Sequence, residues 1–159
     1  MTAMTHSANP NLPSARWSAS VAALGLVLAT PAATWWLVGD QSVQSQTDLD
    51  YVVRLNVDPG VERLAGIAGL VLLAASVVTL LLASRNRGLD RRWVWVVGPL
   101  VVAGVIVGAG LRIVTAGVIG ANIGAGFAVV FGAPVVAGLL LWALGRSLYL
   151  VIKGRRQSG

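Results

Sequence analysis

Long uncharged apolar stretches dominate this chain. The four stretches are Trp17–Gly39, Leu64–Ser84, Trp93–Leu111 and Ile113–Gly145. An α-helix rises about 1.5 Å per residue, so roughly 20 apolar residues cross a hydrocarbon core of about 30 Å. Each of the first three stretches matches one crossing, and the fourth contains a Gly-rich turn followed by one more crossing. The sequence therefore predicts an all-α membrane protein, an antiparallel four-helix transmembrane bundle.

The predicted organisation leaves little chain outside the membrane. Of the 159 residues, 56% are hydrophobic and only 11% are charged, which leaves no room for a separate soluble domain. We expect a transmembrane domain at 17–153, between a disordered cytoplasmic tail (1–16) and a second cytoplasmic tail (154–159). The expected parts are helices at about 17–39, 61–84, 93–115 and 124–152, an outer loop at 40–60 and a cytoplasmic loop at 85–92. That short cytoplasmic loop predicts that the second and third helices are antiparallel neighbours.

Basic residues are unevenly distributed between the two sides of this topology. Nine of the 12 Lys and Arg residues lie on the side that holds both termini. They are Arg16, Arg85, Arg87, Arg91, Arg92, Arg146, Lys153, Arg155 and Arg156. By the positive-inside rule, both termini are predicted to be cytoplasmic and the 40–60 loop to be outside. Anionic lipid is an expected partner of this basic face, and the net charge of +6 gives no reason to expect a nucleic-acid partner.

The first apolar stretch has two interpretations, a membrane anchor or a cleaved signal peptide. Only one charge, Arg16, directly precedes it, Pro31 interrupts its small residues, and Trp35 and Trp36 follow at once. Indole rings prefer the headgroup region of a bilayer. These features favour the anchor.

Arg112 is the single charge in the long run from Trp93 to Gly145. A charge costs about 3 kcal/mol at the bilayer centre on insertion scales and much less near the interface. Lying about 29 Å beyond Trp93 along a helix axis, Arg112 is expected near the outer boundary. Three interpretations remain: snorkelling to outer headgroups, pairing with an outer-loop carboxylate, or a ligand or ion site. The candidate carboxylates are those of Asp40, Asp50 and Asp58.

Small residues four positions apart occur in two helices. Gly104 and Gly108 form a GxxxG pair in the third helix, and Ala65 and Gly69 form a similar pair in the second. Such spacing lets helix backbones approach closely, which drives packing in lipid. The pairs serve packing within the chain, or they serve a homo-oligomer or a partner protein.

Three other polar residues are candidates for a functional or structural role. Asn122 is predicted to be a cap or turn residue between the third and fourth helices, with substrate contact as the alternative. In the outer loop, Asp50 and Arg54 lie with Asp48 in a polar segment. That segment is either a solvated turn or part of a metal or phosphate site in an enzyme that acts on lipid.

The absence of certain residue types narrows the function further. The four apolar stretches contain no Asp, Glu, His or Lys, and the chain has no cysteine. Thiol chemistry is therefore excluded, and so is the membrane-embedded carboxylate on which proton-coupled small multidrug transporters depend. His6, the one histidine, lies in the polar N-terminal tail. We expect no catalytic residue, no cofactor and no metal site.

The composition has a bacterial character. Arg outnumbers Lys eleven to one, Ala, Val, Gly and Leu fill the helices, and residues Thr115–Gly126 read TAGVIGANIGAG. In these features the chain resembles small uncharacterised four-helix integral membrane proteins of actinobacteria. The resemblance implies a bacterial plasma membrane and implies no activity.

The leading functional hypothesis is a non-enzymatic integral membrane protein. It would act as an accessory or assembly subunit that packs through small-residue helix faces. The alternative is a small oligomeric transporter or channel with Arg112 near its outer mouth.

Overall fold

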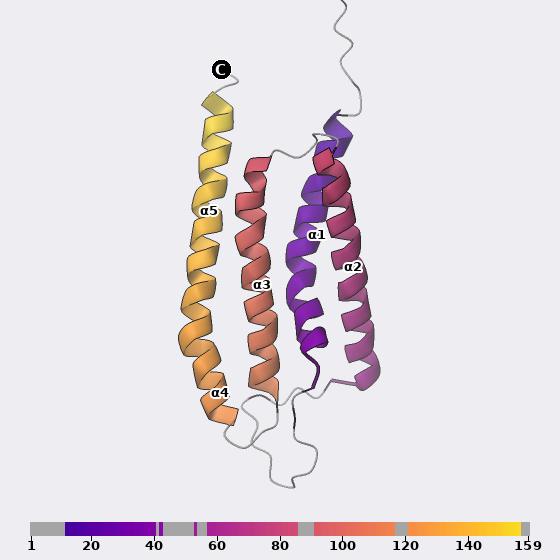
Figure 1. Ribbon diagram of the computed structural model, residues 1–159, viewed down its shortest axis with the longest axis vertical. Coiled ribbons are helices and arrows are strands. Elements are labelled where there is room, and N and C mark those ends of the chain that lie inside the picture. Colours follow the sequence, from indigo (N-terminus) through magenta and orange to yellow (C-terminus); the bar gives the residue numbers. More distant parts are fainter. Residues whose placement is uncertain are drawn as a thin grey trace, which may run out of the picture.

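A computed structural model describes residues 12–40, 42, 53, 57–85, 91–116 and 121–156. In these residues the backbone is almost entirely helical (Figure 1). The elements are α1 (Leu12–Val38), α2 (Pro59–Arg85), the 3-10 turn η1 (Arg91–Trp93), α3 (Val94–Thr115), α4 (Ala121–Phe127), the π-helical turn η2 (Ala128–Gly132) and α5 (Ala133–Arg156). α4, η2 and α5 follow one another without a break and form one long helix.

Four helical segments are long and apolar enough to cross a membrane. They are Trp17–Val38, Pro59–Arg85, Val94–Thr115 and Asn122–Gly154. The prediction of four membrane-length helices is therefore confirmed. Successive segments run in opposite directions in Figure 1. Helices α1 and α3 finish on one side of the molecule, where α2 starts, and we call this side the Arg112 end. The opposite side, where α1 starts and α5 finishes, is called the terminal end.

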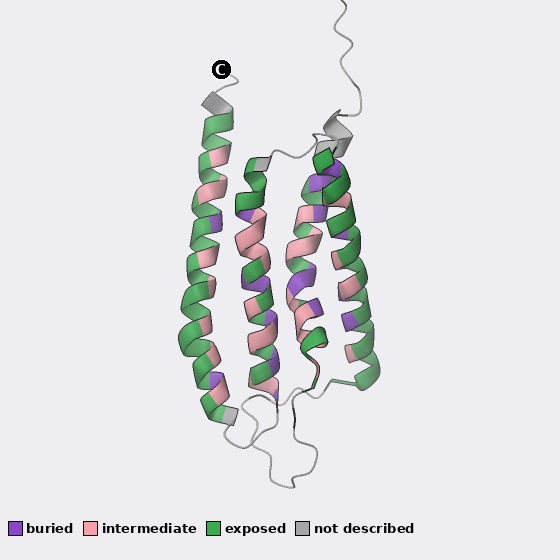
Figure 2. Cartoon of the chain, viewed as in Figure 1, coloured by how far each residue is buried: buried purple, intermediate pink, exposed green. Residues whose placement is uncertain are grey.

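The four long helices lie side by side in one row, in the order α5, α3, α1, α2 (Figure 1). α1 packs against α2 on one side and α3 on the other, and α3 also packs against α5. The expectation that the second and third helices are neighbours is wrong, because α1 lies between them. Buried residues accordingly gather on the facing sides of α1, α2 and α3, whereas α5 is mostly exposed (Figure 2).

Glycines on α2 allow it to approach α1 closely. Gly66 lies under the indole ring of Trp36, and a Cβ placed there would overlap the ring. A Cβ on Gly69 would lie 3.3 Å from the backbone nitrogen of Ala33. Ala65, the predicted partner of Gly69 in packing, is exposed. The small pair that faces α1 is therefore Gly66 and Gly69.

The GxxxG pair of α3 packs against the opposite side of α1. A Cβ on Gly104 would lie 3.1 Å from the Cβ of Thr30 and 3.2 Å from the Cδ of Pro31. A Cβ on Gly108 would overlap the carbonyl oxygen of Pro31 and lie 2.8 Å from the Cβ of Thr34. Both glycines are buried by this contact, so this pair serves packing within the chain.

The second helix begins earlier than predicted, at Pro59 instead of residue 61. The Oδ1 atom of Asp58 accepts hydrogen bonds from the N–H groups of Gly60 (2.8 Å) and Val61 (3.3 Å). Asp58 is thus an N-cap, and Pro59 occupies the first helical position, where a missing N–H costs nothing.

The first and fourth helices also extend beyond their predicted bounds. α1 begins at Leu12, inside the predicted 1–16 tail, because Pro13 is tolerated in a first turn whose N–H groups lack acceptors. At the other end of the chain, helix begins at Ala121 instead of 124 and continues to Arg156 instead of 152. Residues 1–11, and 86–90 of the predicted cytoplasmic loop, lie outside the described residues.

We predict that Gly108→Ala destabilises the protein and that Gly110→Ala, on the same helix, does not. The new methyl group at 108 would overlap α1, whereas a Cβ at 110 meets nothing within 4 Å. Overpacking of this kind costs about 1–3 kcal/mol. Thermal unfolding in mild detergent measures the difference. Equal midpoints for the two variants would show that α1 and α3 are not in close contact at Gly108.

Candidate functional site

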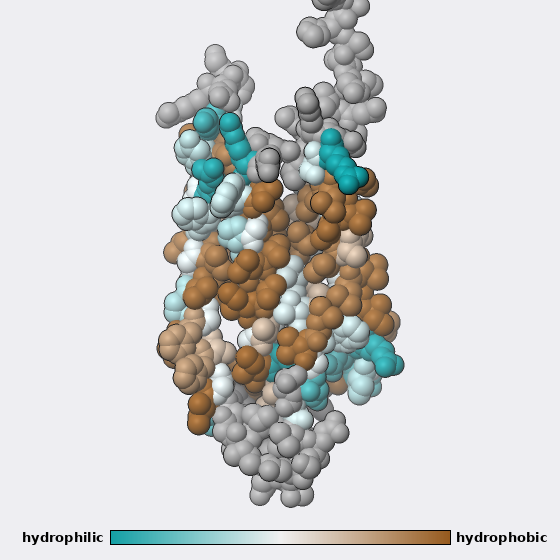
Figure 3. All heavy atoms as spheres, in the orientation of Figure 1, coloured by the Kyte–Doolittle hydropathy of each residue, from teal (hydrophilic) through white to brown (hydrophobic). Residues whose placement is uncertain are grey.

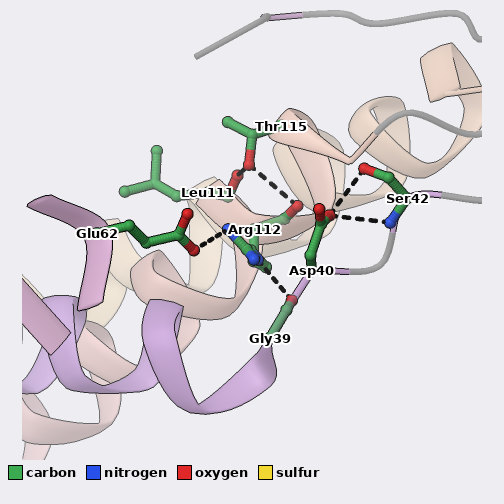
Figure 4. Close-up of polar contacts among 7 residues, drawn as sticks. All are labelled: Gly39, Asp40, Ser42, Glu62, Leu111, Arg112 and Thr115. Carbon is green, nitrogen blue, oxygen red and sulfur yellow. Dashed lines mark hydrogen bonds and ion pairs between the residues drawn. The ribbon is translucent and has the colours of Figure 1, made fainter. Parts of the chain in front are cut away.

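Arg112 lies in the last turn of α3, where it meets the end of α1 and the beginning of α2 (Figure 4). Its side chain is only 8% exposed. Nη1 is 3.1 Å from Oε1 of Glu62 on α2, and Nε donates a hydrogen bond to the carbonyl oxygen of Gly39. The guanidinium carbon lies 4.7 Å from the centroid of the Trp35 ring on α1. We call Trp35, Gly39, Glu62 and Arg112 the Arg112 cluster.

The backbone at the end of α1 directs a carbonyl group toward Arg112. Gly39 follows the last helical residue and has a φ of 70°, a left-handed conformation that glycine adopts without strain. Its N–H donates to the carbonyl oxygen of Trp36 at 3.1 Å, which closes the helix end. The carbonyl end of a helix carries partial negative charge, so the cation of Arg112 is favourably placed there.

Glu62 is favourably placed for a second reason besides its ion pair. It lies in the first turn of α2, where exposed N–H groups carry partial positive charge. The Glu62–Arg112 pair therefore complements one helix N-terminus and one helix C-terminus at once. A charge-assisted hydrogen bond of this kind contributes about 1.5–3 kcal/mol, and the stacked indole adds a cation–π attraction.

Arg112 pairs with a carboxylate, but the carboxylate is that of Glu62 in the first turn of α2, whereas the expected partners were Asp40, Asp50 and Asp58 of the outer loop. Asp58 caps α2 instead, and Asp50 lies outside the described residues. The sequence did carry a signal for Glu62. It is one of two charged residues directly before the second apolar stretch, so it sits at the same predicted boundary as Arg112.

Asp40 adds negative charge beside the cluster without forming an ion pair with it. Its Oδ1 accepts hydrogen bonds from the hydroxyl of Ser42 (2.7 Å) and from the Ser42 backbone N–H (3.0 Å) (Figure 4). These bonds, the hydroxyl foremost, lower the pKa of Asp40, and attraction to Arg112 lowers it further, while partial burial opposes both. Asp40 therefore stays ionised and helps to balance the charge of Arg112.

The remaining predicted polar residues do not join the cluster. Asn122 is exposed in the first turn of α4. Residues 117–120, which precede this helix, lie outside the described residues. Thr115 closes the end of α3, since its hydroxyl donates to the carbonyl oxygens of Leu111 (2.9 Å) and Arg112 (3.2 Å). Asp50 and Arg54 lie outside the described residues.

The chemistry of the cluster is electrostatic. It contains one cation, one carboxylate, one carbonyl and one aromatic ring, and it includes no nucleophile with an adjacent base. Across the part of the chain that the structure describes, no three His, Cys, Asp or Glu side chains are grouped so as to hold a metal ion. The arrangement can join three helices at one end and shield a charge from the membrane.

Comparisons of this chain with protein-family models, with curated proteins and with solved structures found no match. The fold and the cluster define a class, an all-helical protein with four candidate membrane spans and a charged cluster at one end.

We predict that Glu62→Gln lowers the free energy of unfolding by about 1.5–3 kcal/mol, because it removes the charge partner of a buried cation. Arg63→Gln is the matched control, since Arg63 is adjacent but exposed. Arg112→Met should then cost less in the Glu62→Gln background than in the original chain. A double-mutant cycle in detergent measures this coupling, expected at about 1–3 kcal/mol. Strictly additive effects would contradict the ion pair.

Proposed function

We propose that this chain is a non-enzymatic protein of the bacterial plasma membrane that acts as an accessory or assembly subunit. Its partner would be a transmembrane helix of another protein, packed along the outward face of α5. The carrying observation is that α5 has its main packing contact with another long helix along α3. In the most apolar 18-residue segment of this fourth span, only 6% is buried within the chain, whereas 28% is buried in the corresponding segment of the first span.

Small residues on α5 support a helix as the occupant of this face. Gly138 and Gly145 are seven residues apart, which puts them on the same side of a helix. Both are exposed, and a Cβ at either position would meet nothing within 4 Å. In contrast, Gly104 and Gly108 are already covered by α1. Close approach of helix backbones at small residues is a main source of affinity in lipid, so α5 retains packing surface that the chain itself does not use.

We further propose that both termini are cytoplasmic and that the row of helices completes an antiparallel bundle only with its partner. The charge distribution supports this orientation, because Arg85, Arg146 and Lys153 all lie toward the terminal end. In the row, α5 has one neighbouring long helix, and the partner helix would give it the second neighbour that a helix has in a bundle.

The alternative, an oligomeric transporter or channel with Arg112 near its outer mouth, has less support from this geometry. Arg112 is engaged by Trp35, Gly39 and Glu62 of its own chain. A transported anion would have to compete with the Glu62 carboxylate, which already pairs with the Arg112 guanidinium. The alternative remains open to a flux assay in proteoliposomes.

We predict that Leu141→Cys, on the outward face of α5, cross-links to a second protein in source membranes. The chain has no cysteine, so one substitution gives one reactive position for a thiol-directed photo-crosslinker. Leu81→Cys is the matched control, because Leu81 is also an exposed leucine and lies in α2 toward the terminal end of the molecule. Gel mobility and mass spectrometry identify the product.

Each outcome of this experiment decides between the hypotheses. A defined adduct with another protein from position 141, absent from position 81, supports the accessory role. An adduct with the mass of two copies of this chain would indicate a homo-oligomer and would favour the transporter alternative. No adduct beyond lipid at position 141 contradicts the proposed docking face.

A further inference from the structure

The long helix that ends the chain extends past its neighbour. Two contacts set its register against α3: a Cβ on Gly124 would lie 3.4 Å from Ile113, and one on Gly132 would lie 3.6 Å from Ile106. The two helices are antiparallel, so ten residues after Gly132 on the last helix correspond to ten residues before Ile106 on α3. Trp142 is therefore level with Val96. α3 begins at Val94, so α5 continues for about 18 Å beyond it, as Figure 1 shows.

Tryptophans mark where this projecting part leaves the hydrocarbon layer. Trp93 and Trp95, at the start of α3, and Trp142, level with them on α5, are all exposed. Such a belt of indoles is typical of the boundary between hydrocarbon and headgroups. The headgroup layer is about 5–8 Å thick on each side, so the first turns of α5 beyond Trp142 lie among lipid headgroups.

A basic and aromatic face occupies this part of α5. The guanidinium carbon of Arg146 is 5.4 Å from the centroid of the Tyr149 ring, and Nζ of Lys153 is 5.8 Å from it. Within the described residues, neither cation forms an ion pair with a carboxylate. We call Arg146, Tyr149 and Lys153 the Arg146 face. Figure 3 shows hydrophilic side chains gathered at this end of the molecule.

We propose that the Arg146 face is a binding site for the phosphate group of an anionic phospholipid. Both cations lie within 5.8 Å of the Tyr149 ring centroid, and a phosphate bound beside them would lower their mutual repulsion. Helical side chains lean toward the helix N-terminus, which for α5 is the membrane side. Lys153 and Tyr149 therefore lean back toward Arg146 and the headgroup layer, and the Tyr149 ring holds both cations on one side of the helix.

This site is independent of the proposed docking of a partner protein. Arg112 offers an instructive contrast, because its charge is balanced by Glu62 inside the chain. The charges of Arg146 and Lys153 have no such balance among the described residues. Arg146 lies about 6 Å beyond Trp142, within the headgroup layer, and the Lys153 side chain leans back toward that layer, where phosphate is present at high local concentration.

The test is native mass spectrometry of the full-length chain in detergent, titrated with phosphatidylglycerol or phosphatidylcholine. We expect phosphatidylglycerol to remain bound and phosphatidylcholine to dissociate. Arg146→Gln or Lys153→Gln should weaken phosphatidylglycerol binding about fivefold. Tyr149→Leu should also weaken it, whereas Tyr149→Phe keeps the ring and the affinity. The matched control is Arg85→Gln, which removes an exposed charge from the end of α2 on the same side.

Three results would overturn the proposal. Equal binding of phosphatidylcholine would show that the phosphate charge is not recognised. An equal loss in Arg85→Gln would show diffuse attraction instead of a site. Competition by millimolar glycerol phosphate would identify a soluble phosphate as the ligand. Thermal unfolding shows whether a variant is still folded. Without added lipid, Arg146→Gln should unfold at the same temperature as the original chain. With phosphatidylglycerol, it should lack the rise in unfolding temperature that the lipid gives to the original chain.

Discussion

The structure depends on the neutralisation of one charge near the end of a helix that is long and apolar enough to cross a membrane. Arg112 is carried at the end of an otherwise uncharged helix, so its guanidinium must find partners or water. It finds a carboxylate at the start of α2 and a carbonyl at the end of α1. One side chain thereby fixes the relative heights of three helices. The length of each helix then decides where the opposite ends lie.

Lateral order follows from a second constraint, the contact between backbones. Lipid is as apolar as the helices, so burial of apolar surface does not by itself bring helices together. Close packing does, and glycines permit it. Gly66 and Gly69 on α2 and Gly104 and Gly108 on α3 all face α1. α1 is therefore the middle helix of three, and its bulky Trp36 and Pro31 fill the space that these glycines leave open.

This division explains which features the sequence could predict. The number and type of helices follow from the lengths of apolar runs, which are properties of each segment alone. The sequence also contains the signal for the start of α2 at Pro59, because Asp58 and Pro59 form a standard N-cap and first position, although we expected the helix to begin at residue 61. The neighbours of α1 and the role of Gly66 were not predictable, because they depend on which helix faces meet. For the Glu62–Arg112 pair, the sequence indicated only that both residues lie at the same boundary. A short loop constrains direction but leaves room for another helix to lie between its ends.

The two ends of the molecule handle positive charge in opposite ways, and that difference is informative about function. At the Arg112 end, a buried cation has its counter-charge within the chain, so its role is to hold helices together. At the terminal end, Arg146 and Lys153 share one aromatic ring and lie beyond the end of the neighbouring helix. Among the described residues, no carboxylate pairs with these two cations. The same electrostatics that closes the Arg112 cluster with an internal acid therefore supports the proposal that a lipid phosphate, an abundant anion at a membrane surface, supplies the counter-charge at this end.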